Sequence, residues 1–163
     1  CLPSVRKSVP IGHAHALAHP ANHNNSNLSP HSGEMTLASS IIPQHKCDDS
    51  ALRHLHAASD TEVIAVLTEL LEWLQARNWP VARLIPTRLA MLDAALAAPI
   101  TQILRGLDCF WKYSLLQCLF PLISIEVLRL LEPELRRLAD EPTAEDHAEE
   151  VHIAAAELLA ERA

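Results

Sequence analysis

The sequence predicts an all-α fold, a short HEAT-like α-solenoid of antiparallel helical hairpins preceded by a disordered tail. Three observations predict it. From about residue 41 onward, apolar residues recur at the 3.6-residue spacing of an amphipathic helix. Helix start and stop signals divide this region into segments of about 10 to 15 residues. The segments form hairpins that repeat every 30 to 40 residues or so, which is typical of helical repeat proteins.

Residues 1–40 have the composition of a disordered tail. They contain five of the ten histidines, four of the eleven prolines and two of the three glycines, among Ser and Asn. Such a segment buries too little apolar surface to offset the entropy cost of ordering it. Its histidines are spaced like metal ligands, but Pro20 interrupts any helix that would align them, so we interpret them as solvated. The chain therefore divides into a tail, 1–40, and a HEAT-like helical domain, 41–163.

Capping signals mark the first helices of the domain. Asp49 or Ser50 can cap a short first helix. Ser59, with Glu62 three residues later, forms a capping box that begins a second helix, which ends at Asn78. The inner face of this second helix is predicted to carry the apolar residues Val63, Val66, Leu67, Leu70, Leu71 and Leu74.

Prolines, a glycine and a second capping box mark the later turns. Pro80 begins a helix that returns antiparallel to the preceding one, with a bend expected at Pro86. The chain breaks again around Gly106, and Thr143 with Asp146 caps the last helix. The helix that follows Asp108 is apolar nearly all round and is expected to be central. The predicted helices from Pro80 onward cover residues 80–96, 99–107, 109–119, 125–139 and 143–162.

Charge and composition exclude several classes of function. The formal net charge is -7, and residues 41–163 carry 11 basic and 19 acidic side chains, which gives -8 for the folded part. A nucleic-acid partner is therefore not expected, because such binding depends on Lys and Arg neutralising phosphates. The longest apolar stretch, residues 114–125, falls short of the roughly 20 residues of a membrane span, so no membrane segment is expected. The four cysteines lack any CxxC spacing and are predicted to be reduced thiols in the cytoplasm.

Four short motifs, in a fixed order and spacing, carry a resemblance to a known family. They are Ile42-Pro43 with Lys46 and Asp48; Asn78-Trp79-Pro80-Val81-Ala82; Asp108 with Trp111-Lys112-Tyr113; and Pro142-Thr143 with Glu149-Glu150-Val151. With them, residues 41–159 resemble the family catalogued as domain of unknown function 5071. Its members are small intracellular proteins with an all-helical, HEAT-like fold, so the resemblance implies the fold and brings no established activity. His45 stands where members usually carry an acidic residue.

The candidate interaction residues are Trp79, Asp108, Trp111, Lys112 and Tyr113. Aromatic side chains gathered on one rim can form a pocket or a peptide-docking surface, although they serve equally as large pieces of a core, which is the interpretation we favour. Asp108 can cap the helix after it. Lys112 lies in an apolar helix, so it either extends its stem over the surface, which we favour, or pairs with a carboxylate in a groove.

No reaction can be derived from the sequence, and no catalytic, metal or cofactor site is predicted. A catalytic pair would need a cysteine nucleophile, Cys109 or Cys118, and a histidine base, His147 or His152, but nothing in their spacing supports such a pair. A thiol in an apolar helix is also usually inert. Three glycines leave no loop to hold a phosphate. We therefore expect a non-enzymatic module that binds a protein or peptide. The alternative is a small-ligand-binding protein or enzyme with a pocket near Trp79, Asp108, Trp111 and Lys112.

Overall fold

The computed structural model describes residues 40–76 and 80–161, and within these ranges every regular element is a helix. The prediction of an all-α fold is confirmed. The predicted tail up to residue 39 and the turn residues 77–79, including Trp79, lie outside the described residues. The elements are α2 (Asp49–Ala57), α3 (Asp60–Ala65), α4 (Leu67–Glu72), the 3-10 helix η1 (Trp73–Ala76), α5 (Pro80–Leu89), the 3-10 helix η2 (Ala90–Leu96), α6 (Ala97–Arg105), α7 (Cys109–Cys118), α8 (Ile125–Asp140), α9 (Ala144–Ala148) and α10 (Val151–Ala160).

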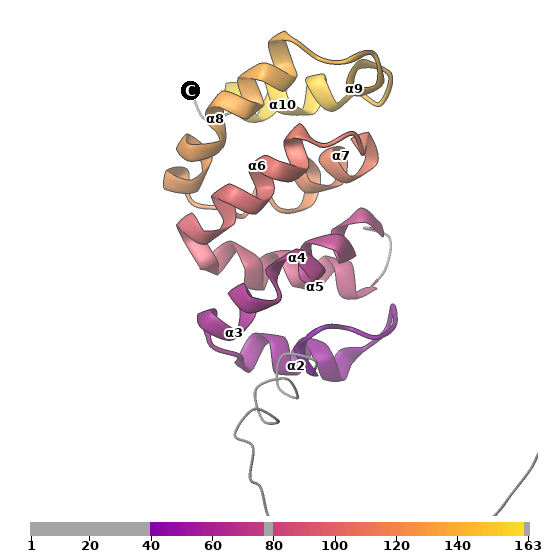
Figure 1. The fold of residues 1–163 in the computed structure, drawn as a ribbon, viewed down its shortest axis with the longest axis vertical. Coiled ribbons are helices and arrows are strands. Elements are labelled where there is room, and N and C mark those ends of the chain that lie inside the picture. The colour runs from indigo at the N-terminus through magenta and orange to yellow at the C-terminus, as the bar shows by residue number, and fades with distance from the viewer. Residues whose placement is uncertain (1–39, 77–79, 162–163) are drawn as a thin grey trace, which may run out of the picture.

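The helices are stacked in chain order along the long axis of the molecule (Figure 1). α2 and α3 lie at one end, followed by α4 with α5, then α6 with α7, and finally α8 with α9 and α10. Contacts between successive levels hold the stack together: α2 packs on α5, α6 on α8, and α7 on both η1 and α10. The connections from α6 to α7 and from α8 to α9 lie along the same edge of the stack (Figure 1).

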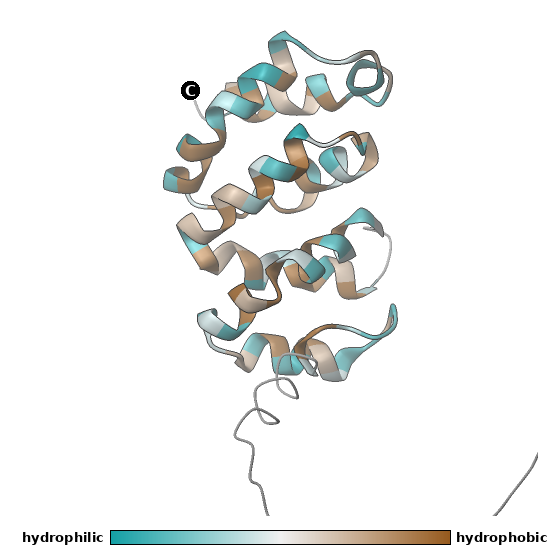
Figure 2. Cartoon of the chain, viewed as in Figure 1, coloured by the Kyte–Doolittle hydropathy of each residue, from teal (hydrophilic) through white to brown (hydrophobic). Residues whose placement is uncertain are grey.

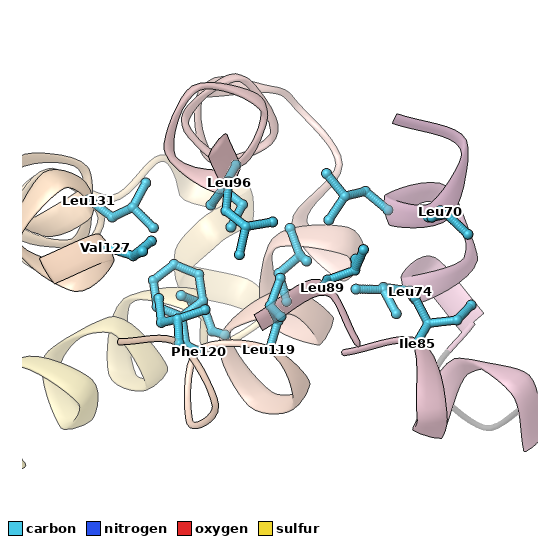
Figure 3. Close-up of a cluster of buried hydrophobic side chains, with 14 of the residues drawn as sticks. Leu70, Leu74, Ile85, Leu89, Leu96, Leu119, Phe120, Val127 and Leu131 are labelled. Atoms are coloured by element: carbon cyan, nitrogen blue, oxygen red, sulfur yellow. The ribbon is translucent and has the colours of Figure 1, made fainter. Parts of the chain in front are cut away.

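A single hydrophobic core runs through the stack, because each helix turns an apolar stripe towards its neighbours. Leu70 and Leu74 meet Ile85 and Leu89 at one end of the region in Figure 3, and Phe120 lies towards α8 at the other. Hydrophobic and hydrophilic residues alternate along almost every helix in Figure 2, as expected for elements with one buried side. Removal of these side chains from water is the main source of stability for such a stack.

Local hydrogen bonds confirm most of the predicted helix starts. The two capping boxes, Ser59 with Glu62 and Thr143 with Asp146, are both formed, and Asp108 caps α7 by accepting a hydrogen bond from the Trp111 amide at 2.9 Å. The first helix differs from its prediction, since the cap of α2 is Asp48 and not Asp49 or Ser50. Asp48 takes this role because its carboxylate accepts a hydrogen bond from the amide of Ala51, three residues later.

Two of the predicted long helices are interrupted, so these expectations were wrong. The helix expected from Ser59 to Asn78 breaks at Val66, where the backbone turns to φ -123 and ψ 22, and gives α3, α4 and η1. The helix expected from Thr143 to Arg162 breaks at Glu150, which adopts a left-handed conformation with φ 58. Apolar periodicity does not report such breaks, because the buried stripe continues on both sides of them.

The segment from Pro80 to Arg105 forms a nearly continuous helical stretch of 26 residues. Pro86 lies inside α5 without ending it, whereas Asp93, with φ 46 and ψ -128, interrupts the helical backbone. By length and composition alone this stretch is apolar enough to cross a membrane, with a mean hydropathy of 1.2 over 18 residues. Part of this apolar surface is used in the core, since Ile85 and Leu96 are fully buried, whereas Leu84 and Met91 are exposed. The expectation that the protein has no membrane segment stays a prediction.

Candidate functional site

A buried ion pair joins α7 to α9. The Lys112 ammonium lies 2.8 Å from Oδ1 of Asp146, and the exposed fractions of the two side chains are 3% and 0%. The Cys109 thiol lies one helical turn before Lys112 and donates to the same carboxylate oxygen over 3.3 Å. Charges taken out of water are costly unless they are paired and hydrogen-bonded, and here the carboxylate meets both conditions.

The pair is positioned by the caps of its two helices. Asp108 begins α7, which places Cys109 and Lys112 on the side facing α9. Asp146 is the third residue of α9, where it also completes the capping box with Thr143: its amide donates to the Thr143 hydroxyl at 3.1 Å. One carboxylate thus serves the start of α9 and the contact between two helices.

The environment of Asp146 sets the protonation of the cluster. Burial raises the pKa of Asp146, but hydrogen bonds from Lys112, Cys109 and Thr143 outweigh burial and leave this pKa below its ordinary value. Burial raises the pKa of the Cys109 thiol, and its hydrogen bond to the Asp146 carboxylate raises it further. The cluster therefore contains a carboxylate and a protonated thiol, which makes Cys109 a poor nucleophile.

This arrangement corrects the interpretation of Lys112. We favoured a stem that extends over the surface, and that expectation was wrong, because the side chain is buried and paired with a carboxylate. The partner is Asp146, which the sequence had indicated only as the second residue of the capping box with Thr143.

Asp108 and Trp111 line one wall of an apolar cavity of about 290 Å³ between α4, α6 and α7. Trp111 is held in place by its indole Nε1, which donates to the Leu71 carbonyl at 3.0 Å. Leu107 also lines this cavity, and its side chain is 94% exposed. We call this space the apolar cavity; its remaining lining residues are Thr68, Leu71, Pro99, Gln102, Ile103 and Gly106.

The other predicted site residues lie elsewhere. Lys112 lines a second cavity, of about 270 Å³, which also includes Leu107 in its lining. Tyr113 lines a third, of about 370 Å³, together with Phe110, whose side chain is 69% exposed. The predicted site residues are thus divided among three cavities around the start of α7, and Trp79 lies outside the described residues.

The aromatic residues do not all serve the core, as we had favoured. Phe120 is fully buried, and Trp73 and Trp111 pack against the core while partly exposed, but Phe110 is turned towards solvent. The helix expected to be central packs on η1, α6 and α10, but Phe110 in its first turn is exposed. Leu107 and Phe110 together expose apolar surface beside the cavities, and we call the region formed by Leu107, Asp108, Phe110 and Trp111 the junction surface.

The combination of Cys109 with His147 or His152 considered from the sequence is not assembled. Cys109 has Asp146 as its side-chain partner, and His147 and His152 stack on each other with ring centroids 4.3 Å apart. Within residues 40–76 and 80–161, no group of three or more His, Cys, Asp or Glu side chains is placed to hold a metal ion.

Sequence reasoning missed two contributors to the site, Leu107 and Asp146 as the partner of Lys112. A lysine in an apolar helix did signal that a carboxylate partner was needed, and Asp146 stood in a recognised capping box. Nothing in the spacing joined them, because they are 34 residues apart and belong to different helices. Leu107 follows Gly106 directly after α6, and its exposure depends on where the connection to α7 lies.

The fold and the site define the chain as an all-α domain with one core, a buried ion pair and an apolar surface at the α6–α7 connection. It belongs to the family described as domain of unknown function (DUF5071), whose sequence model matches residues 41–159. The resemblance noted in the sequence is confirmed. A search of curated proteins finds none that matches the chain.

Proposed function

We propose that this chain is a short HEAT-like α-solenoid of antiparallel hairpins that acts as a non-enzymatic protein-interaction module, with the junction surface as its binding site. The observation that carries the proposal is the exposure of Leu107, at 94%, on the rim of the apolar cavity. Phe110 adds a second exposed apolar side chain in the first turn of α7. Apolar side chains beside a concave apolar surface are typical of a docking site.

The packing beneath this surface supports the proposal. Trp111 is fixed by its hydrogen bond to Leu71, and Ser114, one turn later, donates from its hydroxyl to the Leu74 carbonyl. The Lys112–Asp146 pair holds the other side of α7. A surface whose supporting side chains are fixed in advance loses less conformational entropy when a partner binds. A cytoplasmic location belongs to the same proposal, and the free thiols of Cys47 and Cys109 support it.

The proposal is tested by capture of partners with matched surface variants. Wild-type protein, Leu107→Asp and Leu130→Asp are immobilised, and the proteins retained from a cell extract are quantified by mass spectrometry. Leu130 is a matched control because it is 56% exposed on α8 and lines none of the three cavities. We expect Leu107→Asp to lose proteins that wild type and Leu130→Asp retain. The proposal is wrong if the three baits retain the same proteins, provided circular dichroism shows equal helicity.

The apolar cavity also favours a second candidate function, the binding of a small apolar ligand. Its volume of about 290 Å³ is at the small end of ligand sites. A small ligand seated beside Trp111 would change the indole environment, and titration of the purified protein with a library of fragments, followed by NMR, measures this directly. Shifts confined to the cavity residues would support the ligand function; an absence of saturable shifts would leave the interaction proposal as the better explanation.

A further inference from the structure

The apolar cavity adjoins a second cavity that presents cationic side chains. The two share Gly106 and Leu107 in their linings, so they adjoin at this short segment. We call the second space the basic cavity; its other lining residues are Arg105, Lys112, Arg137, Thr143 and Glu145. The carboxylates that pair with its three cations, Glu134 and Asp146, are not among its lining residues. The cavity wall therefore presents three cationic side chains and the Glu145 carboxylate, and each cation is already paired with a carboxylate that does not line the cavity.

Lys112 gives the observation that points to a ligand. An ammonium group has three N–H donors. The Lys112 side chain is only 3% exposed. Its ammonium group donates one hydrogen bond to a described residue, Asp146. Buried donors without acceptors are unfavourable. The ammonium thus has donors available for an acceptor that enters the basic cavity.

The neighbouring groups also retain donors. Arg105 and Arg137 bond to Glu134 through Nε, at 2.7 Å and 2.9 Å, and Arg137 uses Nη2 for the Leu104 carbonyl. A guanidinium has five N–H groups. The bonds above use Nε and Nη2, and the N–H groups on Nη1 of both arginines have no bond to a described residue. The Thr143 hydroxyl adds no free donor, because it accepts from the Asp146 amide and is itself hydrogen-bonded to the Asp146 carboxylate. The free N–H donors suit a carboxylate, which accepts several hydrogen bonds at once.

We propose that the junction surface binds the free carboxyl terminus of a peptide that ends in an apolar residue. The last side chain enters the apolar cavity and the terminal carboxylate enters the basic cavity, which adjoins it at Leu107. This inference rests on the proposed interaction function and specifies the partner. Capture of a terminal carboxylate by convergent donors is an established mode of peptide recognition.

The geometry favours a chain terminus over an internal acidic residue. Successive side chains of an extended peptide point to opposite faces, so an internal acidic residue and an apolar residue face the same surface only when they are two positions apart and therefore further from each other. In a terminal residue the carboxylate and the side chain diverge from the same Cα and can enter both. The overall charge of -7 gives no general attraction for acidic peptides, so recognition depends on these local donors.

The inference is tested with synthetic peptides and the full chain. The probes are fluorescein-labelled Gly-Ser-Gly-Ser-X peptides, where X is Ala, Val, Leu, Ile or Phe, each made as the free acid and as the carboxamide. A further probe is the amidated sequence Gly-Ser-Glu-Gly-Leu-Ser, in which Glu and Leu are two positions apart and face the same side. Fluorescence polarisation gives the dissociation constants. We expect the free acids with Leu, Ile or Phe to bind about tenfold or more tightly than their amides, since one charge-assisted hydrogen bond is worth about a factor of ten.

Two protein variants locate the binding. Arg105→Gln removes an exposed cation of the basic cavity and should weaken the free acids several-fold without changing the amides. Arg136→Gln is the matched control, because Arg136 is equally exposed on α8 and pairs with Glu132 but does not line the cavity. The inference is overturned if acids and amides bind alike, if the internal Glu probe binds as tightly as the acids, if no probe binds, or if both variants act equally. Failure here with continued loss of partners by Leu107→Asp would leave the proposed function standing.

Discussion

Lys112 on α7 and Asp146 on α9 form a fully enclosed ion pair, with 2.8 Å between Nζ and Oδ1, although 34 residues separate them in the sequence. The pair ties the level of α6 and α7 to the last level of the stack. Lys112 is also one of the residues that line the basic cavity. The same contact therefore contributes to stability and shapes the candidate binding surface.

The first prediction concerns the removal of one member of this pair. Lys112→Met leaves Asp146 as an uncompensated buried charge and should lower the free energy of unfolding by about 3–5 kcal/mol. Urea unfolding followed by circular dichroism measures the change. The double variant Lys112→Met/Asp146→Asn should lose less than the sum of the two single variants, because neither charge remains.

A surface pair provides the control for this prediction. Arg136 and Glu132 lie four residues apart on α8 and are both exposed to solvent. Pairs of this kind contribute little, so Arg136→Met should cost below about 1 kcal/mol. Equal losses in Lys112→Met and Arg136→Met would show that the buried pair contributes no more than a surface pair.

The second prediction is that the ion pair makes stability depend on acid pH. The pKa of Asp146 in the folded chain lies below its ordinary value of 3.8, despite the opposing effect of burial, because of hydrogen bonds from Lys112, Cys109 and Thr143. A carboxyl group with a lowered folded pKa contributes stability that is fully present above the unfolded pKa. This stability is lost as the pH falls towards and through the folded pKa.

Urea midpoints measured between neutral pH and the acid limit of folding give the test. Wild type should lose more stability on acidification than Lys112→Met/Asp146→Asn, which has no titrating group at position 146. The other carboxylates with lowered pKa, such as Glu134 beside Arg105, are common to both proteins and cancel in the comparison. Parallel curves for the two proteins would contradict the assignment.

The third prediction concerns thiol reactivity. Burial, followed by the hydrogen bond to Asp146, raises the pKa of Cys109, whereas Cys47 is exposed before α2. The thiolate is the reactive form, so Cys109 should react with N-ethylmaleimide more than about tenfold more slowly than Cys47 at neutral pH. Peptide mass spectrometry at timed intervals distinguishes the two sites. Equal rates in the native protein would contradict the burial of Cys109, and equal rates in urea are the expected control.

The fold was largely predictable because its signals are local. Capping boxes at Ser59 and Thr143 and the cap at Asp108 depend on residues three positions apart, and all three are formed. Apolar periodicity also located the buried residues of the long helices, because it too depends on residues three or four positions apart. The breaks at Val66 and Glu150 were missed, because a break in a helix that is buried on one side leaves its periodicity almost unchanged.

The candidate site was less predictable because it depends on contacts between helices. Asp108 and Trp111 were singled out and do line one cavity, but Lys112 could not be assigned to Asp146 without knowing that α7 and α9 are neighbours. Leu107 had no distinguishing signal at all, since leucine is usually buried and nothing in the sequence marks this one as exposed. Its exposure at the rim is a property of the tertiary structure.

The last prediction concerns Glu150, which connects α9 to α10 in a left-handed conformation with φ 58 and ψ 19. Residues with a Cβ atom lose roughly 1 kcal/mol or more in this region, and glycine does not. Glu150→Gly should therefore raise the free energy of unfolding by about 0.4–1 kcal/mol, measured in urea. Glu149→Gly is the matched control, because Glu149 is also exposed but has φ -97, where glycine brings only its entropy cost of about 0.5–1 kcal/mol. Opposite signs for these neighbouring substitutions would confirm the left-handed link, and a loss of stability in both would contradict it.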